Sequence, residues 1–200
     1  MTAQIVIVDS GGANIASLEF ALARLGVAAE LTVDHDAIRA ADRVLLPGVG
    51  AARDSMDRLE QHGLVDVIRG LRQPVLGICL GMQLLAEASE EDDVECLGVI
   101  PAVAAKLEAR AALPVPNMGW CLTRQDGADP VLDGIAGESW FYYLHSYALP
   151  VGAYTLATAA HGVEFSAVVR RDNFVAAQFH PERSSAAGAR LLRNFATLDT

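Results

Sequence analysis

The chain has 200 residues, 52% of them hydrophobic, and a formal net charge of −10 at pH 7. This length suits a single domain with a full core, which we expect to span residues 1–200. The acidic balance argues against a nucleic-acid partner, because such a surface needs clustered Lys and Arg. No membrane span is expected either, since no apolar run approaches roughly 18 to 20 residues.

The cysteines and the amino terminus favour a cytoplasmic protein. Three cysteines, at positions 79, 96 and 121, fit reduced thiols better than a disulfide framework, and their separation matches no zinc motif. The first residues lack a basic leader, and the apolar run behind them soon meets Asp9, so no signal peptide is expected. The loop at residues 10–14 lacks the three-glycine spacing of a dinucleotide site. We therefore expect neither a metal nor a cofactor.

Strands and helices alternate through the first half of the chain. Residues 5–8 (Ile-Val-Ile-Val) read as a buried parallel strand, and Asn14 is a plausible N-cap of a helix that Gly26 ends. Further strands are expected at residues 29–33, 43–46 and 74–79, and further helices at residues 51–60, 64–71 and 82–88. This alternation predicts an α/β fold with a flavodoxin-like, doubly wound, mostly parallel sheet.

The second half has shorter strands with little helix between them. The expected strands are residues 103–107, 140–144, 154–159, 165–170 and 174–178. They predict antiparallel additions that extend or cover the parallel sheet. A last helix, at about residues 185–195, is expected to bury Leu191, Leu192 and Phe195.

Cys79 is the strongest candidate for a catalytic nucleophile. It follows an apolar strand and lies in the sequence Gly-Ile-Cys-Leu-Gly at residues 77–81, the spacing of a nucleophile elbow. Such a cysteine is exposed at the carboxyl edge of the sheet, and the start of a helix favours its thiolate. The backbone N–H of Leu80 then becomes an oxyanion donor. The alternative is an inert buried cysteine.

His180 and Glu182 supply the missing partners of a triad. His180 precedes Pro181, which favours extended geometry, and in an extended segment positions i and i+2 face the same way. Glu182 can then orient the imidazole while His180 serves as base and acid. Without a cysteine elbow, a surface His-Pro-Glu turn would be the simpler interpretation. The other histidines considered, at positions 35, 62 and 161, are expected to face solvent.

Three further features belong to the same edge of the sheet. The loop at residues 47–50 (Pro-Gly-Val-Gly) can aim a backbone N–H into the site, although an ordinary strand-ending turn is equally possible. Gln83 lies one helical turn after Cys79 and shares its face. Glu91 belongs to an acidic stretch, residues 87–95, that can also be read as a solvated turn.

Taken together, these segments resemble the class I glutamine amidotransferases, the family of triad glutaminases. The elbow is common to that family, whereas the Met-Gly-Trp and His-Ser-Tyr segments resemble its glutaminase subunits from the histidine pathway. The resemblance runs from end to end of the chain and rests on residues 47–50, 77–85, 117–120, 142–147 and 180–184.

The resemblance implies a role for each matching residue. Cys79 attacks the side-chain amide of L-glutamine, His180 protonates the departing ammonia, and Glu182 orients His180. Ammonia passes to a separate (β/α)8-barrel cyclase subunit, with which this chain forms a heterodimer. The remaining roles are oxyanion donors (Leu80 and the Gly48–Val49 peptide), glutamine binding (Gln83, Glu91, Ser146 and Tyr147) and the subunit interface (Asn117, Met118, Trp120, Tyr142 and Arg183).

The chain departs from the pattern of these relatives at three places. Ser10 stands where the first loop usually has Tyr, Asn117 replaces a frequent His, and Arg183 replaces a frequent Lys. The last two departures bear on signalling across the interface rather than on the chemistry. Three alternatives remain open: a glutaminase of another pathway, a stand-alone elbow-cysteine peptidase or redox protein, and a catalytically inactive structural partner.

Overall fold

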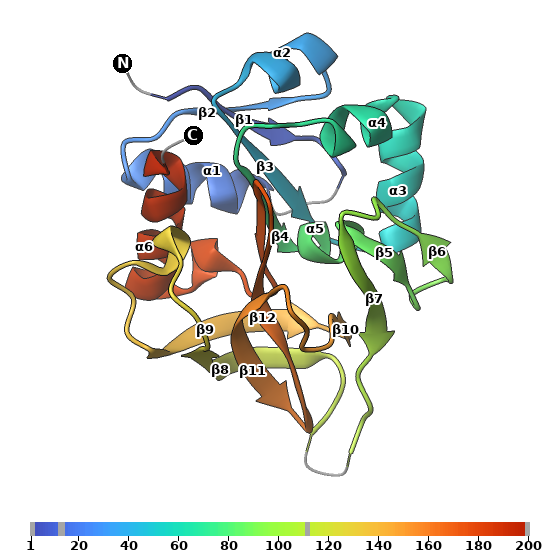
Figure 1. Ribbon diagram of the computed structural model, residues 1–200, viewed down its shortest axis with the longest axis vertical. Coiled ribbons are helices and arrows are strands. Elements are labelled where there is room, and N and C mark those ends of the chain that lie inside the picture. The colour runs from blue at the N-terminus through green and yellow to red at the C-terminus, as the bar shows by residue number, and fades with distance from the viewer. Residues whose placement is uncertain (1–2, 12–14, 111–112, 199–200) are drawn as a thin grey trace.

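The computed structural model describes residues 3–11, 15–110 and 113–198. A nine-stranded sheet forms the body of the molecule, and a four-stranded sheet lies beside it (Figure 1). The large sheet has the order β2-β1-β3-β4-β13-β12-β11-β8-β9, and the small one has the order β10-β7-β5-β6. The strands are β1 (Ile5–Val8), β2 (Ala29–Thr32), β3 (Arg43–Gly48), β4 (Val75–Cys79), β5 (Ala86–Ser89), β6 (Val94–Glu95), β7 (Ile100–Lys106), β8 (Asn117–Gln125), β9 (Glu138–His145), β10 (Tyr147–Ala148), β11 (Thr155–His161), β12 (Val163–Arg171) and β13 (Phe174–Ala177).

Helices cover both faces of the parallel strands. Figure 1 shows α1 and α6 on one side of β1, β3 and β4, with α3 and α4 on the other. The helices are α1 (Ile15–Arg24), α2 (His35–Ala40), α3 (Ala52–Gln61), α4 (Leu64–Arg69), α5 (Leu80–Leu84) and α6 (Ser185–Thr197). None of the helices in the described part of the chain is long and apolar enough to cross a bilayer.

Alternate residues of each parallel strand feed two separate cores. In β1, Val6 and Val8 pack in the core under α3 and α4, whereas Ile5 and Ile7 pack in the core under α1 and α6. Side chains on successive strand positions point to opposite faces, so a strand covered on both sides must be apolar throughout. The continuous apolar run at residues 5–8 has this cause, and the predicted α/β fold is confirmed.

The antiparallel additions are also confirmed. β13 pairs in parallel with β4, and from there outward β12, β11, β8 and β9 pair antiparallel. α6 extends over Ser185–Thr197 and buries Leu191, Leu192 and Phe195 as expected. The sheet thus joins a parallel half, which ends in β13 next to the Cys79 strand β4, to an antiparallel half whose outermost strands are β8 and β9.

Some predicted elements were wrong or missed. The helix expected at residues 82–88 covers only Leu80–Leu84, and the chain then enters β5, which pairs with β6 and β7. Residues 80–86 are buried all round, so periodicity could not separate helix from strand there. α2 was missed, although Asp34 caps it by accepting a hydrogen bond from Ala37 N at 2.7 Å. The proposed N-cap Asn14 lies outside the described residues.

The three histidines expected to face solvent are half-buried instead. His35 Nε2 donates to the carbonyl of His62 at 2.7 Å, and His161 Nε2 donates to the carbonyl of Pro114 at 2.9 Å. None of the three lines the cleft that Cys79 faces.

Candidate active site

Cys79 occupies a strained turn between β4 and α5. Its backbone has φ 53° and ψ −109°, a region that residues with a Cβ rarely adopt, and its side chain is 6% exposed. The parallel register places Gly48 beside it, at the end of β3. The turn therefore presents the thiol at the carboxyl edge of the sheet, next to the Pro-Gly-Val-Gly loop, as an elbow requires.

Gly81 makes this turn possible. A Cβ on Gly81 would lie 1.8 Å from the carbonyl oxygen of Leu46, so no larger residue fits while α5 packs this closely on β3. The helix that follows is only five residues long. A single turn has a small dipole, so the helix contributes less to the thiolate than the sequence suggested.

His180 and Glu182 lie on a turn at the end of β13. His180 Nδ1 donates to Glu182 Oε1 at 2.9 Å, and both side chains are almost fully buried. The prediction that the two side chains meet is confirmed, and His180 itself is extended, with φ −95° and ψ 96°. The extended segment does not continue to Glu182, because Pro181–Arg183 form a 3₁₀ turn. Ser184 fixes that turn, because its Oγ donates to the carbonyl of His180 at 2.6 Å and accepts from Tyr142 N at 2.9 Å.

The surroundings of His180 favour its protonated form. Burial by itself lowers the pKa of the imidazole, but hydrogen bonds to Cys79 and Glu182, together with their negative charges, raise the pKa to about 10. Because Nδ1 is committed to Glu182, the other ring nitrogen is the one that serves the sulphur. Cys79, His180 and Glu182 are thus connected in series, the arrangement that a nucleophile, a base and an orienting carboxylate require.

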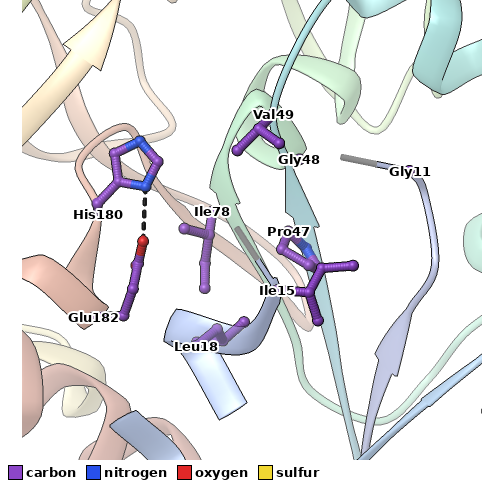
Figure 2. A pocket seen from close by; sticks show the side chains of 9 residues that line it. All are labelled: Gly11, Ile15, Leu18, Pro47, Gly48, Val49, Ile78, His180 and Glu182. Carbon is purple, nitrogen blue, oxygen red and sulfur yellow. Dashed lines mark hydrogen bonds and ion pairs between the residues drawn. The ribbon is translucent and has the colours of Figure 1, made fainter. Parts of the chain in front are cut away.

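A small apolar cavity lies behind this pair. Figure 2 shows His180 and Glu182 on one side of it and Pro47, Gly48 and Val49 on the other. Its remaining lining residues are Gly11, Ile15, Leu18 and Ile78. The apolar walls exclude water from the carboxylate side of the pair, which strengthens its charge interaction with the imidazole.

The thiol faces a larger cleft of about 420 Å³, a size that suits a small polar molecule. The walls of this cleft unite segments that are far apart in the sequence. They include Val49, Cys79, Leu80, Gln83, Glu91, Ser146, Tyr147, His180 and Arg183. Among the described residues, no group of three or more His, Cys, Asp or Glu side chains is arranged to hold a metal ion.

Comparison with known proteins agrees with this geometry. Residues 6–198 match the family model of class-I glutamine amidotransferases. The chain belongs to this family. Imidazole glycerol phosphate synthase subunit HisH 2 of Legionella pneumophila (strain Paris) is 48% identical over 196 residues, 98% of each chain. Subunit HisH of the same synthase from Vibrio cholerae serotype O1 is 44% identical over 204 residues, 99% of this chain and 100% of the relative.

Solved structures show the same fold at lower identity. A glutamine amidotransferase crystal structure superposes with a TM-score of 0.73 at 20% identity, covering 96% of both chains. The glutaminase domain of Trypanosoma brucei CTPS has a TM-score of 0.66 at 16% identity, covering 100% of this chain and 96% of that domain.

In this amidotransferase, the residues predicted to bind glutamine lie together in the cleft. Some of their hydrogen-bonding groups, however, already bond to other groups of the protein. Gln83 Nε2 donates to the carbonyl of Tyr147 at 2.9 Å. That carbonyl also accepts from His145 Nδ1 at 2.8 Å, so it has no further lone pair for a ligand. Glu91 Oε2 accepts from Ala52 N at 2.8 Å and caps α3. Glu91 is half-buried at the cleft rather than part of a wholly solvated turn.

The predicted interface residues form an apolar face on β8 and β9, which we call the docking face. Its outward side chains are Met118, Trp120 and Leu122 on β8 and Trp140, Tyr142 and Leu144 on β9, which pair across the two strands. Met118 is 68% exposed and Trp120 is 49% exposed. Trp120 packs edge-on against Tyr142, and the Arg183 guanidinium lies 4.6 Å from the Tyr142 ring centroid.

Asn117 does not belong to the docking face. It is 3% exposed, because positions 117, 119 and 121 of β8 point inward while 118, 120 and 122 point outward. Its Nδ2 donates to His145 Nε2 at 3.0 Å, and its Oδ1 accepts from Cys121 Sγ at 3.4 Å. Asn117 therefore lies one layer behind that face and could act at an interface only through its neighbours.

Two residues at the site were not singled out from the sequence. His145 lines the cleft, and burial lowers the pKa of its imidazole to about 4 despite its hydrogen bond to the Tyr147 carbonyl. Gln178 is fully buried, with its Nε2 3.9 Å from Cys79 Sγ. The sequence signal for His145 was its place inside a segment that resembles the family, and the signal for Gln178 was its place two residues before His180.

Proposed function

We propose that this chain is the glutaminase subunit of imidazole glycerol phosphate synthase and acts as a single amidotransferase domain in the cytoplasm. The observation that carries the proposal is the series Cys79–His180–Glu182 at the edge of a cleft. The nearly full-length similarity to curated subunits of that synthase supports the choice of pathway.

The reaction begins with the Cys79 sulphur. The thiolate attacks the side-chain amide carbon of L-glutamine, and His180 delivers its proton to the departing ammonia. The γ-glutamyl thioester left on Cys79 is then hydrolysed by a water molecule, from which His180 takes a proton. Glu182 holds the imidazole in the tautomer that both steps need, and its burial beside His180 supports this role.

Backbone N–H groups stabilise the oxyanion in this proposal. Leu80 supplies one donor from the elbow, and the Gly48–Val49 peptide supplies the second after reorienting. Ser10 Oγ donates to the carbonyl of Pro47 at 2.6 Å, a contact that restrains the start of this loop. The chain alone is therefore nearly silent, and its partner releases the loop.

The amino-acid end of glutamine lies against Gln83, Glu91 and the Ser146–Tyr147 segment. The amide nitrogen of Gln83 donates its hydrogen bonds to Tyr147 and Gln178, so the amide oxygen is the atom that can accept a hydrogen bond from the substrate. The free oxygen pairs well with an ammonium group, as does the Glu91 carboxylate.

The docking face receives a (β/α)8-barrel cyclase. Met118, Trp120, Tyr142 and Arg183 form this surface, and exposed aromatic side chains beside an Arg are typical of interface hot spots. Ammonia passes to the cyclase without entering bulk solvent. There it reacts with a phosphoribulosyl nucleotide to give imidazole glycerol phosphate and an aminoimidazole carboxamide ribotide.

Glutamine hydrolysis by three mixtures tests the proposal: the chain alone, the chain with the barrel cyclase, and both with the phosphoribulosyl nucleotide. We expect strong hydrolysis only in the last mixture, and none with Cys79→Ala. Hydrolysis indifferent to the cyclase would assign the chain to another pathway, and a lack of hydrolysis in every mixture would overturn the proposal.

A proline at position 49 tests the oxyanion donor. Val49→Pro removes the backbone N–H, and the loss of one such donor lowers the rate on the order of a hundred- to a thousandfold. Stimulation by the cyclase and nucleotide should therefore vanish in this variant. Unchanged stimulation would place the second donor elsewhere.

A further inference from the structure

Gln178 stands at the end of β13, two residues before His180, and its side chain reaches the nucleophile. The residue is fully buried. Its Nε2 lies 3.9 Å from Cys79 Sγ, and its Oε1 accepts a hydrogen bond from Gln83 Nε2 at 3.2 Å. The amide therefore links the sulphur to the floor of the cleft.

The orientation of the Gln178 amide is determined by the Tyr147 carbonyl, through Gln83. The carbonyl of Tyr147 can only accept, so Gln83 must turn its NH₂ group toward it, at 2.9 Å. The second hydrogen of the same NH₂ group goes to Gln178 Oε1. Gln178 is then left with its own NH₂ group facing Cys79, because reversing its amide would set its NH₂ group against the NH₂ group of Gln83.

The sulphur consequently meets two opposing neighbours. As a thiol, Cys79 donates to the carbonyl of Leu144 at 3.6 Å, which favours S–H. The Gln178 N–H group favours the charged form, because a thiolate accepts hydrogen bonds more strongly than a thiol. The other ionisable groups at the cleft are His180, with Glu182 behind it, and Glu91, His145, Tyr147 and Arg183.

We propose that Gln178 is a catalytic residue whose amide N–H stabilises the Cys79 thiolate, with Gln83 holding that amide in the donating orientation. This inference rests on the proposed function, in which the thiolate attacks glutamine. It assigns Gln83 a second task besides binding substrate. It also supplies the stabilisation that the one-turn helix α5 cannot provide.

The test is the pH profile of Cys79 alkylation in the full-length chain. Iodoacetamide modification would be followed peptide by peptide with mass spectrometry, which separates Cys79 from Cys96 and Cys121. In Gln178→Met, a side chain of similar length without donors, the midpoint of the profile should move to higher pH. The rate at pH 7 should fall about three- to tenfold, the size expected for one hydrogen bond.

Gln178→Glu sharpens the test because it keeps the shape and replaces the donor by an acidic group. It should move the midpoint further than Gln178→Met does. The matched control is Asn173→Leu. This variant removes a partly buried side-chain amide that lies just before the same strand and donates to the carbonyls of Leu71 and Gln73. This control should leave the midpoint unchanged.

An unchanged midpoint in both Gln178 variants, or an equal shift in Asn173→Leu, would overturn the inference. If Gln178→Met does not fold, the isosteric Gln178→Glu variant decides alone. The measurement needs neither glutamine nor cyclase, so its failure is separate from a failure of the proposed function, which the three mixtures report.

Discussion

Two buried histidines line the cleft, and their pKa values move in opposite directions. His180 and His145 are 4% and 5% exposed, so burial alone would lower both. The charges and hydrogen bonds of Cys79 and Glu182 raise the pKa of His180 to about 10. His145, held by an amide and a carbonyl, has its pKa lowered to about 4 by burial. The partners, and not the depth, decide which imidazole carries a charge.

The two side chains are also supported differently. His180 stands on a 3₁₀ turn whose position depends on α6 and Ser184. His145 belongs to the β8–β9 ladder, directly opposite Asn117. His145 is thus held by a strand pairing behind the docking face, whereas His180 is held by a short turn.

Removing the carboxylate of the charged pair should have the largest effect. Glu182→Gln keeps the shape but leaves His180 with a neutral partner, as His145 has, so the pKa of His180 should fall. The kcat for glutamine hydrolysis in the cyclase complex should drop on the order of a thousandfold or more. Glu91→Gln, which changes another carboxylate of the same cleft, should raise KM instead. A Glu182→Gln enzyme within tenfold of wild type would remove Glu182 from the triad.

Crowding the turn under His180 should have the next largest effect. A Cβ on Gly188 would lie 2.0 Å from the carbonyl oxygen of Pro181, so Gly188→Ala must push α6 away from the turn. We expect a loss of unfolding free energy on the order of 2 to 3 kcal/mol, as for other overpacked sites. Urea denaturation would measure this loss.

The same variant separates the two histidines. NMR titration of Gly188→Ala should show a changed His180 and an unchanged His145, because only His180 stands on the displaced turn. Ala186→Gly, on the exposed side of α6, should cost about 1 kcal/mol and alter neither titration. Equal disturbance of both histidines would mean that the two supports are coupled.

Giving His145 a charged partner should raise its folded-state pKa, as the charged partners of His180 do. Because its folded pKa lies below the unfolded value of 6.5, the unfolded chain binds the extra proton, and His145 lowers stability as pH falls from 6.5 to 4. Asn117→Asp should raise the folded pKa and remove that loss. Between pH 7 and pH 5 the unfolding curves of variant and wild type should diverge by roughly 2 kcal/mol.

His180 acts in the opposite direction. Its folded pKa is raised, so its contribution to stability is complete below 6.5 and is lost as pH rises toward about 10. The contributions of the two histidines to the pH dependence of the wild-type unfolding free energy partly cancel. Only the difference between Asn117→Asp and wild type therefore isolates His145. Asn117→Leu, which has no charge, should keep the acid dependence; identical slopes for Asp and Leu would refute the electrostatic account.

The segments around Cys79 and His180 could be predicted from the sequence, whereas strand β8, which pairs with the strand of His145, could not. The strand and elbow before Cys79 and the nearby His-Pro-Glu segment have local signatures, namely an apolar run, two close glycines and a turn. β8 has the inverse of the usual pattern, because Met118 and Trp120 face outward while Asn117 and Thr123 face inward. An alternation argument assumes that the apolar side is the buried one, so it missed this strand.

The hydrogen-bond partners were beyond prediction for another reason. Gln178 meets Cys79, and Asn117 meets His145, through strand pairings that join residues far apart in the sequence. Only the register of the folded sheet brings such groups together. The sequence suggested Cys79, His180 and Glu182, whereas Gln178 and Asn117 became visible as partners only in the structure.

The smallest expected effect concerns the thiol that orients Asn117. Cys121 Sγ donates to Asn117 Oδ1, so the NH₂ group of the amide faces His145 Nε2, which must then stay unprotonated. Cys121→Ala removes that donor and allows the amide to turn, so that its oxygen accepts from a protonated Nε2. The pKa of His145 should rise by less than about one unit, the worth of a single weak hydrogen bond.

An NMR titration of the His145 ring would measure that shift. Cys96→Ala is the control, because Cys96 is a buried thiol whose side chain donates locally, to the carbonyl of Val94, two residues before it. It should leave His145 unchanged. If Cys121→Ala also leaves the pKa unchanged, the orientation of the amide is set by His145 itself. The neutral state would then follow from burial alone, and the contrast with His180 would depend on charge rather than on the hydrogen-bond chain behind it.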